Sequence, residues 1–475
     1  MPALDEGLRA RIRKELEGTL GEDRVLWRKS DLLPYTTDAN IQTIRLGDAC
    51  RYFPDLVVLP GTTGEVQAVV KLTAKHKIPL LPKGGGSNRT GMLVPERGGI
   101  VLDTIKMNRV LEVSVPNLYV TVQPGITLKD LEERLEEHGL ALNQEQGSFK
   151  VATVGGSIST AGFGRKHQKY GTISDRVMSL EVVLPDGRIL RTGPKVLYTS
   201  TGYRLSQLFI GAEGTLGVIT EATLRVEPVP EAKGLVMGFF DDFSHAFEAA
   251  GKVTGSGVTF AGAEVYELSD SMSLGAPEGK HGVFCVSLEG TKGEVEAETE
   301  FIRRIILESG GAIASDEAAR QQFEKYTIQW CGLRAVVGFE DDFMPYIPAK
   351  RAEEFYDKVW NDIMPRYGIS PSEDGKYGAD IGRYRMLYGR FIIPDGEVGW
   401  ENYRKAFREI LELAINLGGS IAGCAGIGIK HTDDLPLEYS DAALDLMWRI
   451  KKALDPDDIM NPGKKLPKRK PAAGS

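Results

Sequence analysis

A run of three glycines constrains this chain more than any other feature. It lies in the segment Pro-Lys-Gly-Gly-Gly-Ser-Asn-Arg-Thr-Gly at residues 82–91, directly after the apolar run Ile78 to Leu81. Successive glycines leave backbone N–H groups unshielded and φ free, so the loop can fold around a phosphate as an anion nest. The spacing matches neither the G-x-x-x-x-G-K-[ST] loop nor the G-x-G-x-x-G fingerprint. An ordinary tight turn is the alternative.

A second segment rich in small residues runs from Thr153 to Gly164, in the order Thr-Val-Gly-Gly-Ser-Ile-Ser-Thr-Ala-Gly-Phe-Gly, and Tyr170-Gly171 follows it. The first loop stands at the exit of a predicted strand, where open α/β units bind their ligands. Two such loops on one domain favour a ligand with two ends.

Composition limits the classes of protein to consider. The chain has 475 residues, of which 42% are hydrophobic and 26% charged, and this predicts a globular protein of two or three domains. A net charge of −8 and a pI near 5.6 argue against a nucleic-acid partner. The only basic run, Lys464 to Lys470, is predicted to be a solvated tail rather than a binding arm.

No apolar stretch is long enough to cross a bilayer, and Met1 to Glu17 is a charged amphipathic segment rather than a signal peptide. These observations predict a cytoplasmic protein without a membrane span. The cysteines are too far apart for a CxxC metal or cluster site. Any iron–sulfur relay would therefore lie on another subunit.

Periodicity predicts an α+β chain of two domains. A helix is expected at 6–20, and a helix capped by Thr63 is expected between strands at 57–59 and 78–81. A proline-rich stretch between Arg225 and Leu235 marks the domain boundary. Beyond it, alternating strands and amphipathic helices suit an antiparallel sheet with helices on one face. The predicted divisions are 1–228, 229–440, and a C-terminal helix and tail at 441–475.

Five segments occur in a specific order. They are Pro54-Asp-Leu-Val-Val-Leu-Pro60, the triple glycine, Thr153-Val-Gly-Gly156, Gly211-Ala-Glu-Gly-Thr-Leu-Gly-Val-Ile-Thr-Glu221 and Ile459-Met-Asn-Pro-Gly-Lys464. In this set the chain resembles the FAD-linked oxidases with a vanillyl-alcohol-oxidase or para-cresol-methylhydroxylase (PCMH) type flavin domain. It is most similar to their glycolate oxidase and D-lactate dehydrogenase branch. The resemblance implies a PCMH-type FAD-binding domain, an antiparallel-sheet substrate cap, and hydride transfer from substrate to flavin N5.

The first loop is the candidate pyrophosphate site, through its backbone amides. The second loop and Tyr170-Gly171 would bring backbone donors to the isoalloxazine and ribityl chain. By resemblance, Ile219 would contact the adenine and Asn461 would close the site. The predicted FAD contacts are Pro82, Gly84, Gly85, Gly86, Ser87, Asn88, Gly91, Pro124, Gly125, Thr153, Gly155, Gly156, Ser159, Gly162, Tyr170, Gly171, Glu213, Gly214, Ile219 and Asn461. Ser87 and Asn88 occupy the region where some relatives attach FAD through a histidine, so non-covalent FAD is expected.

Two features of the second domain are candidates for substrate contacts. Trp330 to Arg334 resembles a Trp-x-x-x-Arg element whose arginine binds the substrate carboxylate, although Arg334 could equally be a surface residue. Tyr384, Met386, Tyr388 and Arg390 share one face of a predicted strand by period two. That face would offer phenol and guanidinium donors to an anionic substrate, or it would pack against its own sheet.

The chain differs from the hydroxy-acid members at their metal site. Those members carry Gly-Glu-His-Gly-Ile-Gly, with the histidine as base, where this chain has Gly423-Cys-Ala-Gly-Ile-Gly428. The positions of a further histidine pair align on Ala379 and Met386. No metal site is therefore predicted. Lys430, His431, Tyr384 or Tyr388 would have to replace the missing base.

The favoured function is FAD-dependent oxidation of a small anionic hydroxy acid or alcohol, without a metal. The alternatives are oxidation of a para-alkyl phenol and a flavin subunit of an electron-transfer complex whose own substrate site has decayed. Oxygen, a quinone or an electron-transfer protein would be the acceptor. A homodimer and a hetero-complex both remain open.

Overall fold

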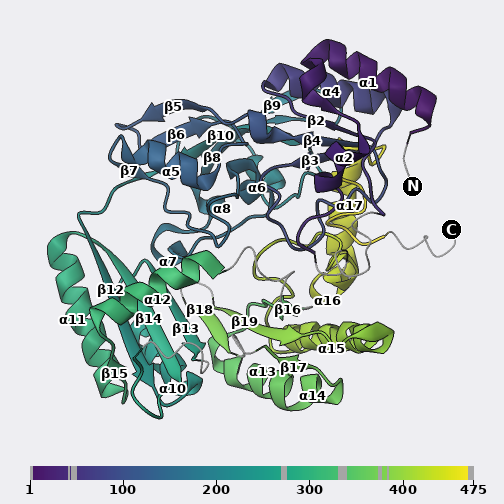
Figure 1. Cartoon of the computed structure of the whole chain (residues 1–475). Helices are drawn as coiled ribbons and strands as arrows, with labels where there is room; N and C mark the ends of the chain where they lie inside the picture. The colour runs from purple at the N-terminus through teal and green to yellow at the C-terminus, as the bar shows by residue number, and fades with distance from the viewer. Residues whose placement is uncertain are drawn as a thin grey trace.

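The computed structural model describes residues 4–40, 43, 51–268, 275–329, 340–372, 377–381 and 385–468. The chain forms two parts (Figure 1). In that view the first part, in purple and blue, lies above the second, in teal and green. The α+β class and the antiparallel sheet expected for the cap are confirmed.

The first part begins with a small sheet in the order β1-β2-β4-β3, whose last three strands are parallel. Its elements are α1 Glu6–Leu20, β1 Val25–Leu26, α2 Lys29–Leu32, β2 Leu56–Val58, α4 Thr63–His76, β3 Leu80–Lys83 and β4 Ile100–Asp103. Strand β2 is buried on both faces, as a parallel strand covered by helices requires. Helix α4 is capped by Thr62 and not by Thr63, because the Thr62 hydroxyl accepts the Glu65 N–H. The glycine loop follows β3 directly.

A five-stranded antiparallel sheet completes the first part, in the order β5-β6-β10-β8-β9. Its strands are β5 Val110–Ser114, β6 Tyr119–Val122, β8 Val177–Val183, β9 Ile189–Arg191 and β10 Val218–Arg225, and β7 Leu140–Ala141 pairs with β11 Glu227–Pro228 nearby. The helices are α5 Leu128–Glu136, α6 Val154–Ser159, α7 His167–Tyr170, α8 Ile173–Arg176 and α9 Ser206–Phe209. The predicted cap of α5 by Thr127 and the predicted β8–β9 hairpin are both present.

The second part is built on one large antiparallel sheet in the order β15-β12-β14-β13-β18-β19-β16, with β17 paired to β19. Its strands are β12 Ala232–Phe240, β13 Gly262–Glu267, β14 Gly282–Gly290, β15 Ala312–Ile313, β16 Glu340–Phe343, β17 Ser370–Pro371, β18 Gly378–Ile381 and β19 Arg385–Ile392. Its helices are α10 Phe243–Gly255, α11 Lys292–Glu308, α12 Asp316–Gln329, α13 Ala352–Lys358, α14 Met364–Arg366, α15 Gly396–Asn416 and α16 Leu435–Glu438.

The pleat divides the side chains of the large sheet between two environments. Ala263 and Val265 of β13 and Ala379 and Ile381 of β18 lie in the main core, under α10, α11, α13 and α15. The alternate positions face the other way, as period two requires. Helix α12 covers part of that second face, where Met237 and Phe239 of β12 pack in one cluster with Ala319 of α12. The prediction that the helices lie on one face of this sheet is therefore wrong, since α12 lies on the other face.

The C-terminal segment returns to the first part, where α17 (Asp441–Leu454, yellow) lies beside its strands (Figure 1). The Leu80 N–H donates to Ile459 O, and the Asn461 N–H donates to Leu80 O. The Lys451 ammonium donates to Thr215 O and Met460 O. The tail is thereby held at the strand that leads into the glycine loop. None of the helices in the described ranges is long and apolar enough to span a membrane.

Candidate functional site

A large cavity lies where the glycine loop, the segment 144–165, strand β10, the C-terminal tail and the second part meet. Its open space is about 1670 Å³, including the mouth. The predicted cofactor residues that line it are Pro82, Gly84, Gly85, Gly86, Ser87, Asn88, Pro124, Thr153, Gly155, Gly156, Ser159, Gly162, Glu213, Gly214, Ile219 and Asn461.

The first loop presents unused backbone donors to this cavity. Among the described residues, the amides of Gly85, Gly86, Ser87 and Asn88 donate to no backbone or side-chain acceptor. Gly86 has φ +77°, in the left-handed region that permits such a turn. A row of free N–H groups facing a cavity is the arrangement that binds a phosphate or another anion.

The second loop plays a different part from the one predicted. The amides of Gly155 and Gly156 are already bonded, to Pro124 O and to the Thr153 hydroxyl, so they are not free donors. What these glycines supply is room. A Cβ at Gly155 would lie 2.6 Å from Pro124 Cβ, and one at Gly84 would lie 2.3 Å from Thr153 Oγ1. Gly84 therefore lets the first loop lie against Thr153 at the start of the second loop, and Gly155 lets the second loop lie against Pro124.

Four predicted contacts do not line the cavity. The Gly91 N–H donates to Asp38, and a Cβ at Gly125 would meet Thr104 O at 1.9 Å. The Tyr170 hydroxyl donates to Glu289 of β14, and the Gly171 carbonyl accepts from Gln144. In this structure these residues shape the loops or join the two parts.

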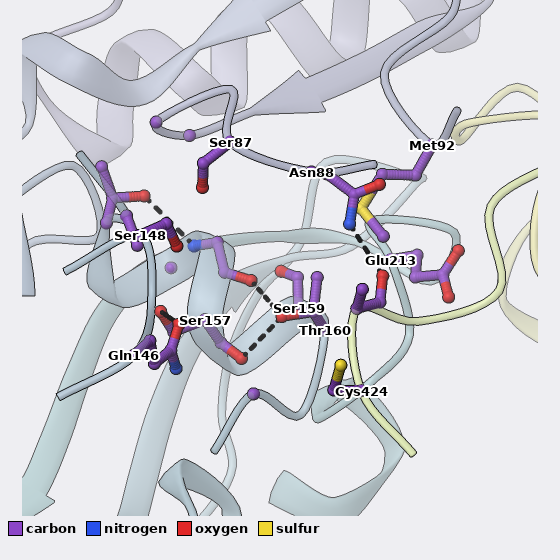
Figure 2. A pocket seen from close by; sticks show the side chains of 18 of the residues that line it. Ser87, Asn88, Met92, Gln146, Ser148, Ser157, Ser159, Thr160, Glu213 and Cys424 are labelled. Carbon is purple, nitrogen blue, oxygen red and sulfur yellow. Dashed lines mark hydrogen bonds between the residues drawn. The ribbon is translucent and has the colours of Figure 1, made fainter. Parts of the chain in front are cut away.

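Asn461 holds the C-terminal tail at the site by hydrogen bonds, and Glu213 does the same for the second part. The Asn461 side-chain amide donates to Met92 O and Glu213 O. The Glu213 carboxylate accepts from the N–H groups of Ile427 and Gly428, at 2.7 and 2.9 Å. The Gly-Ile-Gly turn is therefore held by a glutamate of the first part. Figure 2 shows Glu213 beside Asn88, with Ser159 and Thr160 across the cavity.

Several lining residues were not predicted. Arg89 forms a two-point ion pair with Asp342 of β16, at 2.9 and 2.8 Å. Gln146 lines the cavity and accepts from Ser157, and its buried Nε2 has no acceptor among the described residues. Arg89 was within the quoted glycine loop, and its charge was the available signal. Nothing in the local pattern singled out Gln146.

The cap end of the cavity carries two carboxyl groups side by side. Strand register pairs Glu264 with Asp380 and Asp380 with Met386, and all three line the cavity. Arg165, from the loop before α7, donates from Nε to Glu264 at 3.0 Å and from NH1 to Phe323 O. Burial, with the neighbouring Glu264 charge, raises the pKa of Asp380 to about 8. Burial and the Glu264 charge both favour the protonated form of the Asp380 carboxyl.

Of the predicted catalytic residues that the structure describes, none lines the cavity. Arg334 and Tyr384 lie outside the described residues. Tyr388 is buried beside Met344 and Met386, as the face predicted for it requires, but neither Tyr388 nor Arg390 lines the cavity. Lys430 pairs with Asp341 at 2.7 Å.

His431 does not line the cavity either. It is stacked on Phe407 with ring centroids 5.6 Å apart. Burial lowers its pKa, against the opposing effect of Asp434. The candidates proposed from the sequence to replace the missing base, where described, are thus occupied in packing and ion pairs.

Ala379 and Met386, the positions aligned with the histidine pair of the family, lie on opposite faces of the sheet. Ala379 is fully buried in the main core, and the residue beside Met386 at the cavity is Asp380. Two residues seven apart cannot share a face of this hairpin, because the register pairs 380 with 386. In the part of the chain that the structure describes, no three His, Cys, Asp or Glu side chains gather in an arrangement that could hold a metal ion.

Comparison with known proteins decides the family. A model described as "FAD binding domain" matches residues 54–193, and one described as "FAD linked oxidases, C-terminal domain" matches residues 390–465. The glycolate oxidase subunit GlcD of Bacillus subtilis is 32% identical over 426 residues, covering 86% of this chain and 88% of GlcD. The chain belongs to the FAD-linked oxidase family. The resemblance carried by the five ordered segments is confirmed.

A further relative and two solved structures are also similar to this FAD-linked oxidase. The D-lactate dehydrogenase of Archaeoglobus fulgidus is 34% identical over 424 residues, covering 86% of this chain and 90% of the relative. The solved structure of p-cresol methylhydroxylase with substrate bound superposes with a TM-score of 0.81 at 19% identity, covering 98% of each chain. An alkyldihydroxyacetonephosphate synthase structure gives 0.78 at 23% identity, covering 97% of this chain and 85% of the other. At those identities the two structures show a shared fold.

The cavity fits FAD. The free amides of the first loop suit a pyrophosphate, Gly84 and Gly155 add no side chain to the cavity lining, and Gln146, whose Nε2 has no acceptor among the described residues, lines the same cavity. All three features come from the described residues alone.

Proposed function

We propose that this FAD-linked oxidase oxidises a small anionic 2-hydroxy acid or alcohol, with non-covalently bound FAD and without a metal ion. The observation that carries the proposal is similarity over 86% of the chain to GlcD and to a D-lactate dehydrogenase, whose names state hydroxy-acid substrates. Bound FAD would accept a hydride from the substrate carbon.

Different residues would bind the cofactor and the substrate. The amides from Gly85 to Asn88 would hold the pyrophosphate, and Asn461 would keep the tail closed over the site. Ser87 and Asn88 have no nucleophilic ring nitrogen, so they would leave FAD unlinked. Arg334 would bind the substrate anion through its guanidinium fork.

Anaerobic single-turnover mixing tests the proposal. The FAD-loaded protein, treated with EDTA, is mixed with a panel of D-2-hydroxy acids and, separately, with para-alkyl phenols. We expect the visible flavin absorbance to bleach with a 2-hydroxy acid and not with phenols. Arg334→Lys should slow this bleaching, because one ammonium cannot reproduce the two-point contact.

Reduction by dithionite serves as the control for an intact flavin. Bleaching with phenols alone would replace the proposed substrate class. Bleaching with dithionite but with no member of the panel would identify a flavin subunit without its own substrate. Loss of 2-hydroxy acid turnover on chelation, with recovery on adding one metal, would contradict the metal-free reaction.

A further inference from the structure

The cap end of the cavity contains a carboxyl group that the protein itself does not use. Asp380 lies on β18 between Glu264 of β13 and Met386 of β19, and the pleat points all three into the cavity. Within the described ranges, no side-chain or backbone donor bonds to the Asp380 carboxyl. A carboxyl left without a partner beside a ligand cavity is available to the ligand.

Glu264 differs from Asp380 although the two are neighbours. Its carboxylate is fixed by the Nε of Arg165, whose guanidinium is itself held over the Phe323 ring, 4.0 Å from the centroid. The positive charge of Arg165 is therefore matched by Glu264. Asp380 is the second carboxyl of the pair, and the like charge of Glu264 disfavours its ionised form.

The groups around Asp380 come from four elements. They are Glu264 on β13, Arg165 before α7, Cys424 in the Gly-Cys-Ala-Gly segment, and Tyr356 on α13. Its β19 neighbour Met386 is uncharged. Burial raises the pKa of the Cys424 thiol to about 12 and raises that of the Tyr356 phenol, so both stay neutral over the working pH range. Of the described residues around Asp380, Glu264 and Arg165 are the two that carry charge in that range.

We propose that Asp380 is the catalytic base of this oxidase, with Glu264 and Arg165 as the positioning residues that control its protonation. The inference rests on the proposed oxidation of a hydroxy acid. The hydroxyl O–H bond of the substrate breaks, and its proton passes to a carboxylate oxygen of Asp380. The carbon–hydrogen bond breaks as a hydride that the flavin accepts, and C–O becomes C=O. Atoms and electrons balance with substrate and flavin alone.

The proposal predicts a pH dependence with a definite sign. Because the pKa of Asp380 is raised, its carboxylate form grows over a pH range above that of an ordinary carboxyl group. Proton abstraction should therefore accelerate with pH in this range. Binding of an anion beside Asp380 should weaken over the same range, because a neutral carboxyl becomes a negative charge. Pyruvate is a suitable probe, since it is a carboxylate of the product class that does not reduce the flavin.

The experiment compares native protein with Asp380→Asn, Glu264→Gln and Glu298→Gln at pH 6 to 9.5. FAD content is measured first, and pyruvate affinity is then titrated by the flavin difference spectrum. For Asp380→Asn we expect native FAD content, pyruvate affinity independent of pH, and flavin reduction slower by about 10²–10⁴-fold. Glu264→Gln should move both midpoints to lower pH, because the like charge is removed. Glu298 on α11 also has a raised pKa but lies away from the cavity, so Glu298→Gln should keep the native profiles.

Two results would overturn the assignment while leaving the proposed function intact: native flavin reduction in Asp380→Asn, or a pyruvate pH profile in that variant identical to the native one. Failure of the proposed function is a separate result. In that case no 2-hydroxy acid bleaches the native flavin at any pH, and the base role falls with it.

Discussion

One methyl group is too large for position 85. A Cβ on Gly85 would lie 1.8 Å from Val151 O and 2.9 Å from its carbonyl carbon. Gly85 does not have a positive φ, so conformational freedom is not what this position requires. The glycine is needed because the segment before α6 passes directly against the loop that carries the free amides.

We therefore expect Gly85→Ala to lose most of its bound flavin. The loop must move away from Val151, which displaces the amide row and costs about 1–3 kcal/mol of folding free energy. The measurement is the ratio of flavin to protein absorbance after purification. Gly18→Ala is the matched control, because nothing lies within 4 Å of its Cβ in α1, and it should be neutral or more stable by about 1 kcal/mol. Full flavin content in Gly85→Ala would show that the loop tolerates a shift.

At the scale of elements, the glycine loop is tied to the second part by charge. Arg89 gives two parallel hydrogen bonds to Asp342 on β16, and the Asp342 side chain is only 4% exposed. The same loop also bonds the segment 423–430. Asn88 donates to Ala425 O, and Thr90 O accepts from the N–H groups of Ile429 and Lys430. The cofactor loop and the cap therefore hold one position together.

Breaking this pair should destabilise the protein strongly. Arg89→Met removes two charge-assisted hydrogen bonds from the buried Asp342 carboxylate, at a cost of about 3–5 kcal/mol. The double variant Arg89→Met/Asp342→Leu should recover much of that loss. Thermal unfolding with FAD present measures both effects. The exposed Arg303–Asp316 pair is the control, and Arg303→Met should cost less than about 1 kcal/mol. Equal shifts in the two single variants would mean that the Arg89 pair is no stronger than a surface pair.

At the scale of the whole molecule, the cavity exists only in the folded chain. Its walls come from the first part, the second part and the C-terminal tail, so unfolding any of them removes the site. A ligand that binds only the folded state raises stability by mass action. Bound FAD would thus couple the large hydrophobic clusters of the two parts, in addition to the contacts that join them.

Removing FAD should lower the thermal midpoint of the whole protein. At FAD concentrations about 100 times the dissociation constant, the stabilisation is about 2.7 kcal/mol, and it should grow with further FAD.

Acid precipitation should release intact FAD into the supernatant, as expected for a loop with Ser87 and Asn88 in place of histidine. Flavin fluorescence of pellet and supernatant measures this. Flavin retained on the denatured polypeptide would contradict the non-covalent binding.

The sequence by itself determined the family and the first loop of the site. Helices such as α1 and α5 follow from local periodicity and caps. Each of the ordered glycine segments is recognised from a few consecutive residues. Local signals of this kind do not depend on distant partners. The free amides of the first loop lie where three glycines predicted an anion nest.

Only the tertiary structure decided the cap end of the cavity. Period two shows which residues of β18 share a face, but not which face meets the cavity, and a shift of one residue exchanges them. The sequence alignment therefore placed Ala379 at the site, whereas the register with β13 and β19 puts Asp380 there beside Glu264. Strands far apart in the chain make this pair, and the charge on one carboxyl changes the pKa of the other only once the sheet has formed.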